Sequence, residues 1–198
     1  MLQKNHQIKI KVAVVGAGYI GSVLAAVLAE NGAEVIALDI NKKIVETINL
    51  GKSPVEEPGL EDLIFKNVKA GKLKASNDIS KISQADVILL TVGTPLSDDG
   101  SIDKQALRNA IKSISPFVMD NQLVIVKSTV SPFSTENEVA KPLRKKAKVF
   151  VSFCPERLSE GNAIQDCKTI PVVVGGVDEE SSNRSLEFWK KYLGVDCI

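Results

Sequence analysis

The sequence predicts an α/β protein built on a doubly wound, mostly parallel sheet. Short runs of β-branched and aliphatic residues alternate with amphipathic stretches, as expected when a crossover helix follows each parallel strand. The first apolar run also leads through a glycine-rich turn into a helix rich in Ala and Leu. Of the 198 residues, 44% are hydrophobic and 25% are charged, without an internal repeat or a flexible linker. We therefore expect one domain over residues 1–198.

Seven strands are expected where apolar runs are bounded by turn residues. They are residues 8–15, 34–39, 73–76, 86–92, 122–127, 149–153 and 170–174. Residues 195–198 resemble the start of a further strand.

Seven helices are expected from amphipathic spacing and from end signals. They are residues 20–31, 41–50, 58–71, a short helix before 85, 103–113, a helix from 135, and 178–193. Gly32 suits the end of the first helix, and Pro58 suits the first turn of the third. Thr135 and Glu138 have the spacing of a capping box. The N-caps expected elsewhere are Asn41, Asp103 and Asp178.

Charge and cysteine content exclude several classes of function. The net charge is +1, and the single basic run, residues 144–148, lacks interleaved aromatic residues, so we interpret it as a solvated helix end rather than a nucleic-acid site. The N-terminus lacks the apolar core of a signal peptide, and no apolar helix is long enough to span a membrane. Three cysteines and His6 form no metal-binding pattern, which favours a reduced, cytoplasmic setting without a metal.

A dinucleotide-binding turn is predicted after the first strand. Gly16-Ala17-Gly18-Tyr19-Ile20-Gly21 matches G-x-G-x-x-G between a strand and a helix, the pattern of a Rossmann-type domain. The first glycine permits the tight turn, the second lets a pyrophosphate approach, and the third lets the helix pack closely. The pyrophosphate would then lie at the helix N-terminus.

Asp39 predicts which dinucleotide binds. It ends the second strand, where a carboxylate can bind both ribose hydroxyls and repels a 2′-phosphate, so we predict NAD rather than NADP. The alternative is that Asp39 only caps the following helix. A methyltransferase that binds S-adenosylmethionine also has a glycine-rich turn and an acid at these places, but the motifs further along the chain argue against it.

Four further motifs resemble those of the UDP-glucose/GDP-mannose dehydrogenase family and, together with the glycine-rich turn, extend over nearly the whole chain. They are Glu57-Pro58-Gly59-Leu60, Val92-Gly93-Thr94-Pro95, Ser128-Thr129-Val130, and Pro155-Glu156-Arg157-Leu158-Ser159-Glu160-Gly161. The last is similar to the family pattern P-E-x-x-x-E-G. Five motifs in the right order and spacing make the resemblance specific.

The resemblance implies an oxidoreductase of polysaccharide biosynthesis. Family members use two NAD to oxidise the C6 alcohol of a UDP-hexose or UDP-N-acetylhexosamine to a carboxylate, and a cysteine holds the intermediate as a thiohemiacetal and then a thioester. It implies cofactor contacts from Val92, Gly93, Thr94 and Pro95 on the adenosine side, and from Ser128 to Val130 on the nicotinamide side.

The resemblance also implies roles for five residues near the catalytic centre. Glu156 matches the general base, Thr129 helps to hold the water, and Glu160 lies between cofactor and substrate. Glu156, Arg157 and Leu158 would contact the substrate. Arg157 stands where glucose- and mannose-specific members tend to carry an aromatic residue, which favours the branch acting on N-acetylated hexosamines such as UDP-N-acetylmannosamine. Without the resemblance, Glu156 and Glu160 would be taken as solvated carboxylates at a helix end.

The sequence departs from the family pattern in three respects. Ile44 replaces a frequent Lys or Arg, and Ser131 and Phe133 replace proline and glycine of S-T-V-P-P-G. The G-G-x-C-x-P-K-D motif of the nucleophilic cysteine does not occur. Cys154 is expected to be a core thiol, and Cys167 and Cys197 are not expected to have the general base or basic partner of a reactive thiol.

We therefore expect the NAD-binding part of such an enzyme, without its central helix and nucleotide-sugar domain, and inactive alone. The resemblance implies a homo-oligomer for the full-length enzyme; a monomer for this chain is a hypothesis that sedimentation can check. One alternative is a stand-alone NAD-binding regulatory module without catalysis. A β-hydroxyacid dehydrogenase-type enzyme is another, which the Glu57-to-Leu60 and Val92-to-Pro95 motifs disfavour.

Overall fold

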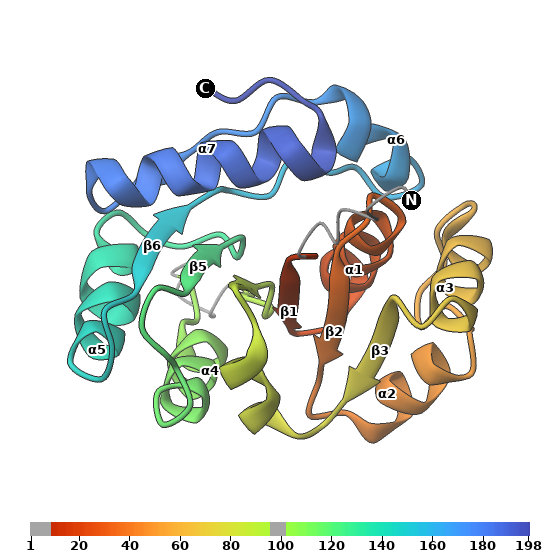
Figure 1. The fold of residues 1–198 in the computed structure, drawn as a ribbon, viewed down its shortest axis with the longest axis horizontal. Coiled ribbons are helices and arrows are strands. Elements are labelled where there is room, and N and C mark those ends of the chain that lie inside the picture. The colour runs from red at the N-terminus through yellow and green to blue at the C-terminus, as the bar shows by residue number, and fades with distance from the viewer. Residues whose placement is uncertain (1–8, 96–101) are drawn as a thin grey trace, which may run out of the picture.

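The computed structural model describes residues 9–95 and 102–198, which form one seven-stranded sheet in the order β3-β2-β1-β4-β5-β6-β7 (Figure 1). The first six strands pair in parallel, and β7 pairs with β6 antiparallel. The strands are β1 (Lys11–Val15), β2 (Glu34–Leu38), β3 (Leu73–Ser76), β4 (Val87–Leu90), β5 (Leu123–Val126), β6 (Phe150–Phe153) and β7 (Gly175–Gly176). This confirms the predicted doubly wound sheet, with a Rossmann-type strand order.

Helices cover both faces of the sheet. They are α1 (Tyr19–Glu30), α2 (Lys42–Asn49), α3 (Leu60–Lys69), the 3₁₀-helix η1 (Ile79–Gln84), α4 (Gln105–Ile114), the π-helix η2 (Thr135–Ala140), α5 (Lys141–Arg144), α6 (Ala163–Thr169) and α7 (Glu179–Leu193). Within the described residues, no helix is long and apolar enough to cross a membrane, and no group of three or more His, Cys, Asp and Glu side chains is placed to hold a metal ion.

The hydrophobic core is divided by the sheet into two halves. Side chains alternate across a strand, so Leu89 of β4 belongs to the half of the core that contains residues of α1, α3 and α7, whereas Ile88 and Leu90 belong to the half with residues of α4 and α5. All four residues of β4 and of β5 are buried. Strands buried on both faces read as continuous apolar runs, which is why these two were visible in the sequence.

Several predicted helix ends are confirmed by side-chain caps. Asn41 accepts a hydrogen bond from the Lys43 N–H, and Asp178 accepts one from the Ser181 N–H. Gly32 has a φ of +99° directly after α1, a left-handed conformation that glycine adopts at low cost.

Three other predicted helix starts are wrong or displaced. Pro58 lies outside α3, because Gly59 is the N-cap and the helix begins at Leu60. The Thr135–Glu138 capping box does not form: η2 has no side-chain cap, and Glu138 instead binds Lys104 at 3.1 Å and Arg108 at 2.9 Å. Lys104, rather than Asp103, is the N-cap of α4, although the Asp103 carboxylate accepts the Gln105 N–H at 2.7 Å.

Two cations explain why Glu138 turns towards α4. Burial opposes ionisation of Glu138, but the hydrogen bonds from Arg108 and Lys104 outweigh it and hold the pKa of that carboxyl below its ordinary value. A capping-box bond would give the Glu138 carboxylate one neutral backbone donor, whereas here it has two cationic partners.

The predicted strand over residues 170–174 is also wrong. Val172 forms only an isolated parallel bridge with Cys197, and the last strand of the sheet is β7, which pairs with Ser152 and Phe153 of β6. The apolar run at 170–174 therefore packs outside the sheet, and residues 195–198 accompany it. The first residue of the predicted strand 8–15, and His6, lie outside the described residues.

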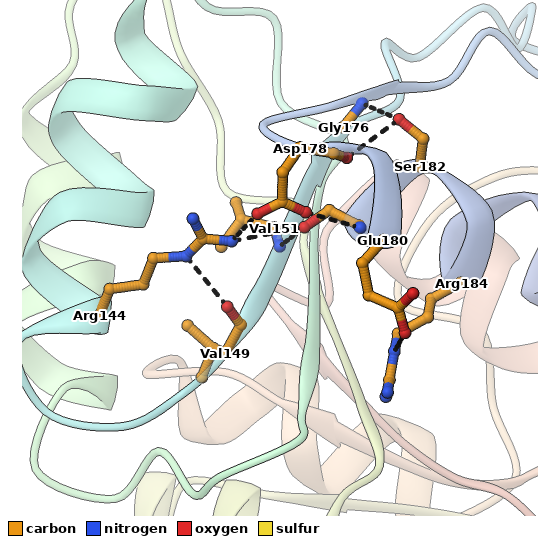
Figure 2. Close-up of polar contacts among 9 residues, drawn as sticks. Arg144, Val149, Val151, Gly176, Asp178, Glu180, Ser182 and Arg184 are labelled. Carbon is orange, nitrogen blue, oxygen red and sulfur yellow. Dashed lines mark hydrogen bonds and ion pairs between the residues drawn. The ribbon is translucent and has the colours of Figure 1, made fainter.

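Asp178 and Ser181, at the start of α7, join this helix to α5 and β6 (Figure 2). Its carboxylate lies 2.5 Å from Arg144 Nη2, and the Arg144 Nε donates to the Val149 carbonyl at 3.1 Å. Ser181 in the first turn accepts the Val151 N–H at 3.0 Å. Arg144, which we expected to be solvated with the rest of the basic run, is thus tied to α7. Glu180 and Arg184 form a separate, exposed pair along α7.

We predict that Asp178→Ala lowers the free energy of unfolding by about 1–2 kcal/mol, most of it from the lost cap, because the half-exposed ion pair with Arg144 adds little. Glu180→Ala is the control and should cost less than about 0.5 kcal/mol, since it removes only a surface pair. Urea denaturation of both variants measures this; equal losses would contradict it.

Candidate functional site

The predicted site residues lie along one edge of the sheet, in loops or in the first turn of α1. Strands β1, β2, β4, β5 and β6 run parallel, so the loops that follow them open on the same side, where open α/β sheets bind ligands. These loops and the first turn of α1 contain residues 16–21, 39, 92–95, 128–130 and 156–160. The structure therefore brings four of the five sequence motifs and Asp39 to one edge, and the Glu57 carboxylate, which accepts the Gly161 and Ala163 N–H groups, brings the fifth beside them.

The glycine-rich turn lies tightly against the ends of β1 and β4. Gly16 has a φ of +95°, and its N–H donates to the Leu38 carbonyl at 2.8 Å. A Cβ on Gly21 would lie 1.8 Å from the Gly16 carbonyl oxygen, so no other residue fits there without displacing α1. This close approach confirms the packing role predicted for the third glycine.

Gly18 faces open space at the N-terminus of α1. It is the N-cap, with φ −67° and ψ −153° and no side-chain cap bond, and a Cβ built there would meet nothing within 4 Å. The first N–H groups of a helix have no partner within the helix and attract negative charge. The turn is therefore shaped to receive an anion such as a pyrophosphate.

Asp39 supports the turn and also borders the following helix. Its Oδ2 accepts the Ala17 N–H at 2.7 Å, and its Oδ1 accepts the Asn41 N–H at 2.8 Å. The N-cap of α2 is Asn41 itself, so Asp39 is more than a helix cap. Ile40 beside it is 98% exposed.

Hydroxyl side chains join the neighbouring loops. The three bonds, each from a side-chain hydroxyl to a backbone carbonyl, are Thr91 to Gly16 (2.6 Å), Ser128 to Val92 (2.6 Å) and Thr94 to Thr129 (2.8 Å). They link the β1 loop to the β4 loop, and the β4 loop to the β5 loop. The edge is thus held together independently of any ligand.

Phe133 retains a glycine-like backbone without being glycine. It stands where the S-T-V-P-P-G pattern has its glycine, and its φ is +64°, in the left-handed region that non-glycine residues enter at a cost. Its side chain is 74% exposed, so packing within the described residues does not offset the strain. The departure in sequence therefore leaves the turn geometry of glycine in place.

Glu156 is turned towards the protein interior. Its Oε1 accepts the N–H groups of Arg157 and Leu158 at 2.7 and 2.8 Å, and its Oε2 lies 3.3 Å from the Nζ of Lys127. The side chains of Lys127 and Glu156 are only 6% and 14% exposed. The Lys127 ammonium also lies 5.3 Å from the ring centre of Trp189, so a cation–π contact adds to the ion pair.

The Lys127–Glu156 pair lies beside the Cys167 thiol, whose pKa is raised. Glu156, Lys127 and Cys167 line a cavity of about 30 Å³, room for roughly one water molecule and far too little for a sugar nucleotide. Burial and the charge of Glu156 raise the pKa of the Cys167 thiol to about 12. Cys154 is fully buried, which confirms the expected core thiol, and it accepts the Trp189 indole N–H at 3.3 Å.

Of the remaining predicted site residues, three face solvent, whereas Ser128 is buried. Thr129, Arg157 and Glu160 are exposed, and Leu158 is half-buried. The Arg157 guanidinium donates to the Pro171 carbonyl at 3.2 Å. These side chains can therefore reach a ligand at the edge, whereas Glu156 as placed borders the small cavity.

Two further carboxylates fix the segment around Glu160. Asp166 accepts the Ser159 N–H at 2.8 Å. Glu57 accepts the N–H groups of Gly161 and Ala163 at 2.8 and 2.9 Å and the Tyr19 hydroxyl. The loop 156–163 is thus held mainly through its backbone.

Sequence analysis missed Thr91, Lys127, Ile40 and the bonding role of Glu57. Lys127 carried a signal, because a lysine that ends an apolar strand requires a buried partner. Ile40 also carried a signal, because it is an apolar residue between Asp39 and the polar residues that follow it. Nothing in the local sequence pairs Glu57 with residues more than 100 positions away.

The chain is similar to known proteins over nearly its whole length. A family model described as the UDP-glucose/GDP-mannose dehydrogenase family, NAD binding domain, matches residues 10–193. The UDP-N-acetyl-D-mannosamine dehydrogenase of Methanococcus maripaludis is 32% identical over 193 residues, covering 96% of this chain and 44% of that protein. The GDP-mannose 6-dehydrogenase of Pseudomonas syringae pv. syringae is 34% identical, covering 95% and 45%.

Structural comparison agrees. A UDP-glucose dehydrogenase from the hyperthermophilic archaeon Pyrobaculum islandicum superposes with a TM-score of 0.90 at 29% identity, over 100% of this chain and 48% of that chain. The chain thus spans slightly less than half the length of the proteins that it matches.

We predict that Phe133→Gly is more stable to unfolding than Phe133→Ala by about 0.5–1 kcal/mol. Glycine relieves roughly 1–2 kcal/mol of left-handed strain but adds about 0.4–1 kcal/mol of unfolded-state entropy. Alanine removes the same exposed ring and keeps the strain, so it isolates the backbone effect. Chemical denaturation decides, and an alanine variant as stable as the glycine variant would show that φ here is unstrained.

Proposed function

Because the chain belongs to the UDP-glucose/GDP-mannose dehydrogenase family and corresponds to its NAD-binding domain, we propose that it serves a nucleotide-sugar 6-dehydrogenase. The full reaction is the oxidation of the C6 alcohol of a UDP-hexose or UDP-N-acetylhexosamine to a carboxylate with two NAD. The observation that carries this proposal is the convergence of the five motifs at the edge where Gly18 leaves the N-terminus of α1 open.

The residues present fit a dinucleotide. The uncapped first turn of α1 would hold the pyrophosphate, since its N–H groups point out of the helix beside Gly18. Asp39 is already oriented by the Ala17 and Asn41 N–H groups and would accept hydrogen bonds from the ribose hydroxyls. The exposed Ile40 offers an apolar surface for the adenine ring.

The linked loops after β4 and β5 would hold the rest of the cofactor. Val92, Gly93, Thr94 and Pro95 follow β4 and lie towards the adenosine and its ribose. Ser128, Thr129 and Val130 follow β5 and lie towards the nicotinamide. The bonds from Ser128 to Val92 and from Thr94 to Thr129 set these loops in place before a ligand arrives, which lowers the ordering cost of binding. Bound NAD supplies the oxidising power of the reaction.

We assign the protein groups of the chemistry to the same edge, two of them exposed and the third, Glu156, turned towards the interior. Glu160 and Thr129 are exposed and are proposed to contact the substrate and the hydrolytic water, with Glu160 also beside the cofactor. Glu156 is proposed as the general base. Its Oε2 accepts no hydrogen bond from the described residues, so it retains an acceptor for a water proton, while Lys127 balances its charge.

None of the cysteines in the described residues suits the nucleophile. Cys154 and Cys167 are buried and Cys197 is partly buried, and burial raises the pKa of both Cys167 and Cys197, whereas a nucleophilic thiol needs a lowered one. We propose that the reactive thiol belongs to the part of the enzyme that this chain does not cover.

We further propose an N-acetylated hexosamine as the sugar. The support is the exposed Arg157 beside Glu156, together with the substrate named for the Methanococcus maripaludis relative. Arg157 and Leu158 would contact this substrate. A cytoplasmic location and a place in polysaccharide biosynthesis belong to the same proposal.

The first prediction is that this chain binds NAD in a calorimetric titration and binds NADP at least about tenfold more weakly, because the Asp39 carboxylate would face the 2′-phosphate. Equal affinity for the two would remove Asp39 from the ribose site. A chain that binds neither, while folded by circular dichroism, would contradict the proposed cofactor site.

The second prediction separates the roles of two glycines. Gly18→Ala should fold with a loss below about 1 kcal/mol, because a Cβ meets nothing there, yet weaken NAD binding about tenfold or more by filling the space of the pyrophosphate.

Gly21→Ala is the contrast, since its Cβ would collide with the Gly16 carbonyl; it should lose about 1–3 kcal/mol of stability. Thermal denaturation and titration of both variants test this. A Gly18→Ala protein with wild-type affinity would place the pyrophosphate elsewhere.

A further inference from the structure

One buried carboxylate, that of Glu57, joins three distant segments at the candidate site. It accepts the Tyr19 hydroxyl from the start of α1, and the Gly161 and Ala163 N–H groups at 2.8 and 2.9 Å. The Gly161 N–H also points to the Tyr19 hydroxyl oxygen at 3.0 Å. Glu57 itself belongs to the loop between α2 and α3, and it is 9% exposed.

The donors around Glu57 are matched to a negative charge. Burial opposes ionisation of Glu57, but hydrogen bonds from Tyr19 and the backbone N–H groups outweigh it and hold the pKa of this carboxyl below its ordinary value. Burial and the neighbouring Glu57 raise the pKa of the Tyr19 hydroxyl, so it stays a donor. A buried carboxylate without such donors would be strongly unfavourable, which explains why the three segments are held tightly around it.

The partners of Glu57 adjoin the functional residues. Tyr19 directly follows Gly18, where the pyrophosphate is proposed to lie, and Gly161 directly follows Glu160. Asp166 and the Glu156 side chain also hold this loop, but through bonds to Ser159, Arg157 and Leu158 within the same stretch of chain. The Glu57 contacts differ because they connect the loop to the dinucleotide turn.

We propose that Glu57 is a positioning residue that holds the dinucleotide turn and the Glu160 loop at a fixed separation, so that NAD binds between parts already in place. The inference rests on the proposed function and adds a residue to it. Tyr19 is the second positioning residue, since its hydroxyl donates to Glu57 and thereby connects Glu57 to the start of α1. A preorganised site binds more tightly because less ordering remains to be done on binding.

The test compares Glu57→Gln, Tyr19→Phe and the double variant by calorimetric titration with NAD. Tyr19→Phe keeps the ring and the charge of Glu57 and removes only the connecting hydroxyl. Each single change should weaken NAD binding about fivefold to tenfold. The double variant should bind NAD as tightly as the single variant with the lower affinity, because both changes break the same link.

Amide hydrogen exchange is the second measurement, and it reports on the connection between the dinucleotide turn and the Glu160 loop. In the wild type, NAD should slow amide hydrogen exchange at Gly161 and Ala163, although the pyrophosphate lies at Gly18; in Glu57→Gln that protection should be lost. A residue with a merely structural role would lower stability without changing this response.

Asp178→Ala is the matched control, because it also removes a carboxylate that accepts a backbone N–H and binds a polar side chain, at the far strand of the sheet. It should lose stability while its NAD affinity and exchange response stay as in the wild type. If Glu57→Gln and Tyr19→Phe lose stability but bind NAD within twofold of the wild type, the inference is overturned and the proposed function stands. If the wild type does not bind NAD, the proposed function fails first and this inference fails with it.

Discussion

The close contact between α1 and the end of β1 is the constraint on which the candidate site depends. Gly21 lets the helix lie so near the turn that a Cβ there would be 1.8 Å from the Gly16 carbonyl oxygen. This proximity places the N-terminus of α1, with its unpaired N–H groups, at the carboxyl edge of the sheet. An anion site at that edge requires no additional side chain, since the helix end provides the donors and the favourable potential.

Around this contact, the edge is organised by bonds between loops rather than by bulk packing. Thr91, Ser128 and Thr94 each donate a hydroxyl hydrogen bond to a carbonyl of the neighbouring loop. Such bonds suit a surface that must stay open, because they hold the backbone in place without filling the space that a ligand needs. The glycine-like φ of Phe133 belongs to the same pattern, since the turn keeps its geometry although the residue disfavours it.

Buried charge organises the last part of the site. Lys127 and Glu156 form an ion pair beneath the loop after β6, and Glu57 accepts three donors beside it. A buried charge is costly unless it is paired and hydrogen-bonded, so each of these groups strongly favours one arrangement of its neighbours. The exposed Glu160 and Arg157 are thereby presented from a loop whose backbone is fixed.

The sequence by itself determined the fold class, several helix ends and the place of the glycine-rich turn, because these depend on local signals. Apolar runs, caps such as Asn41 and Asp178, and the glycine spacing act within a few residues, and parallel strands bring their following loops together by topology alone. Tertiary structure decided the rest.

Glu138 binds two cations of α4 instead of capping its own helix, residues 170–174 pack outside the sheet, and Glu57 meets Gly161 and Tyr19. In each case the competing partner is remote in sequence, and its approach is set by how whole helices and strands pack. The spacing of residues in the sequence does not indicate which remote residues meet, so the pairing of buried charges could be read only from the folded chain.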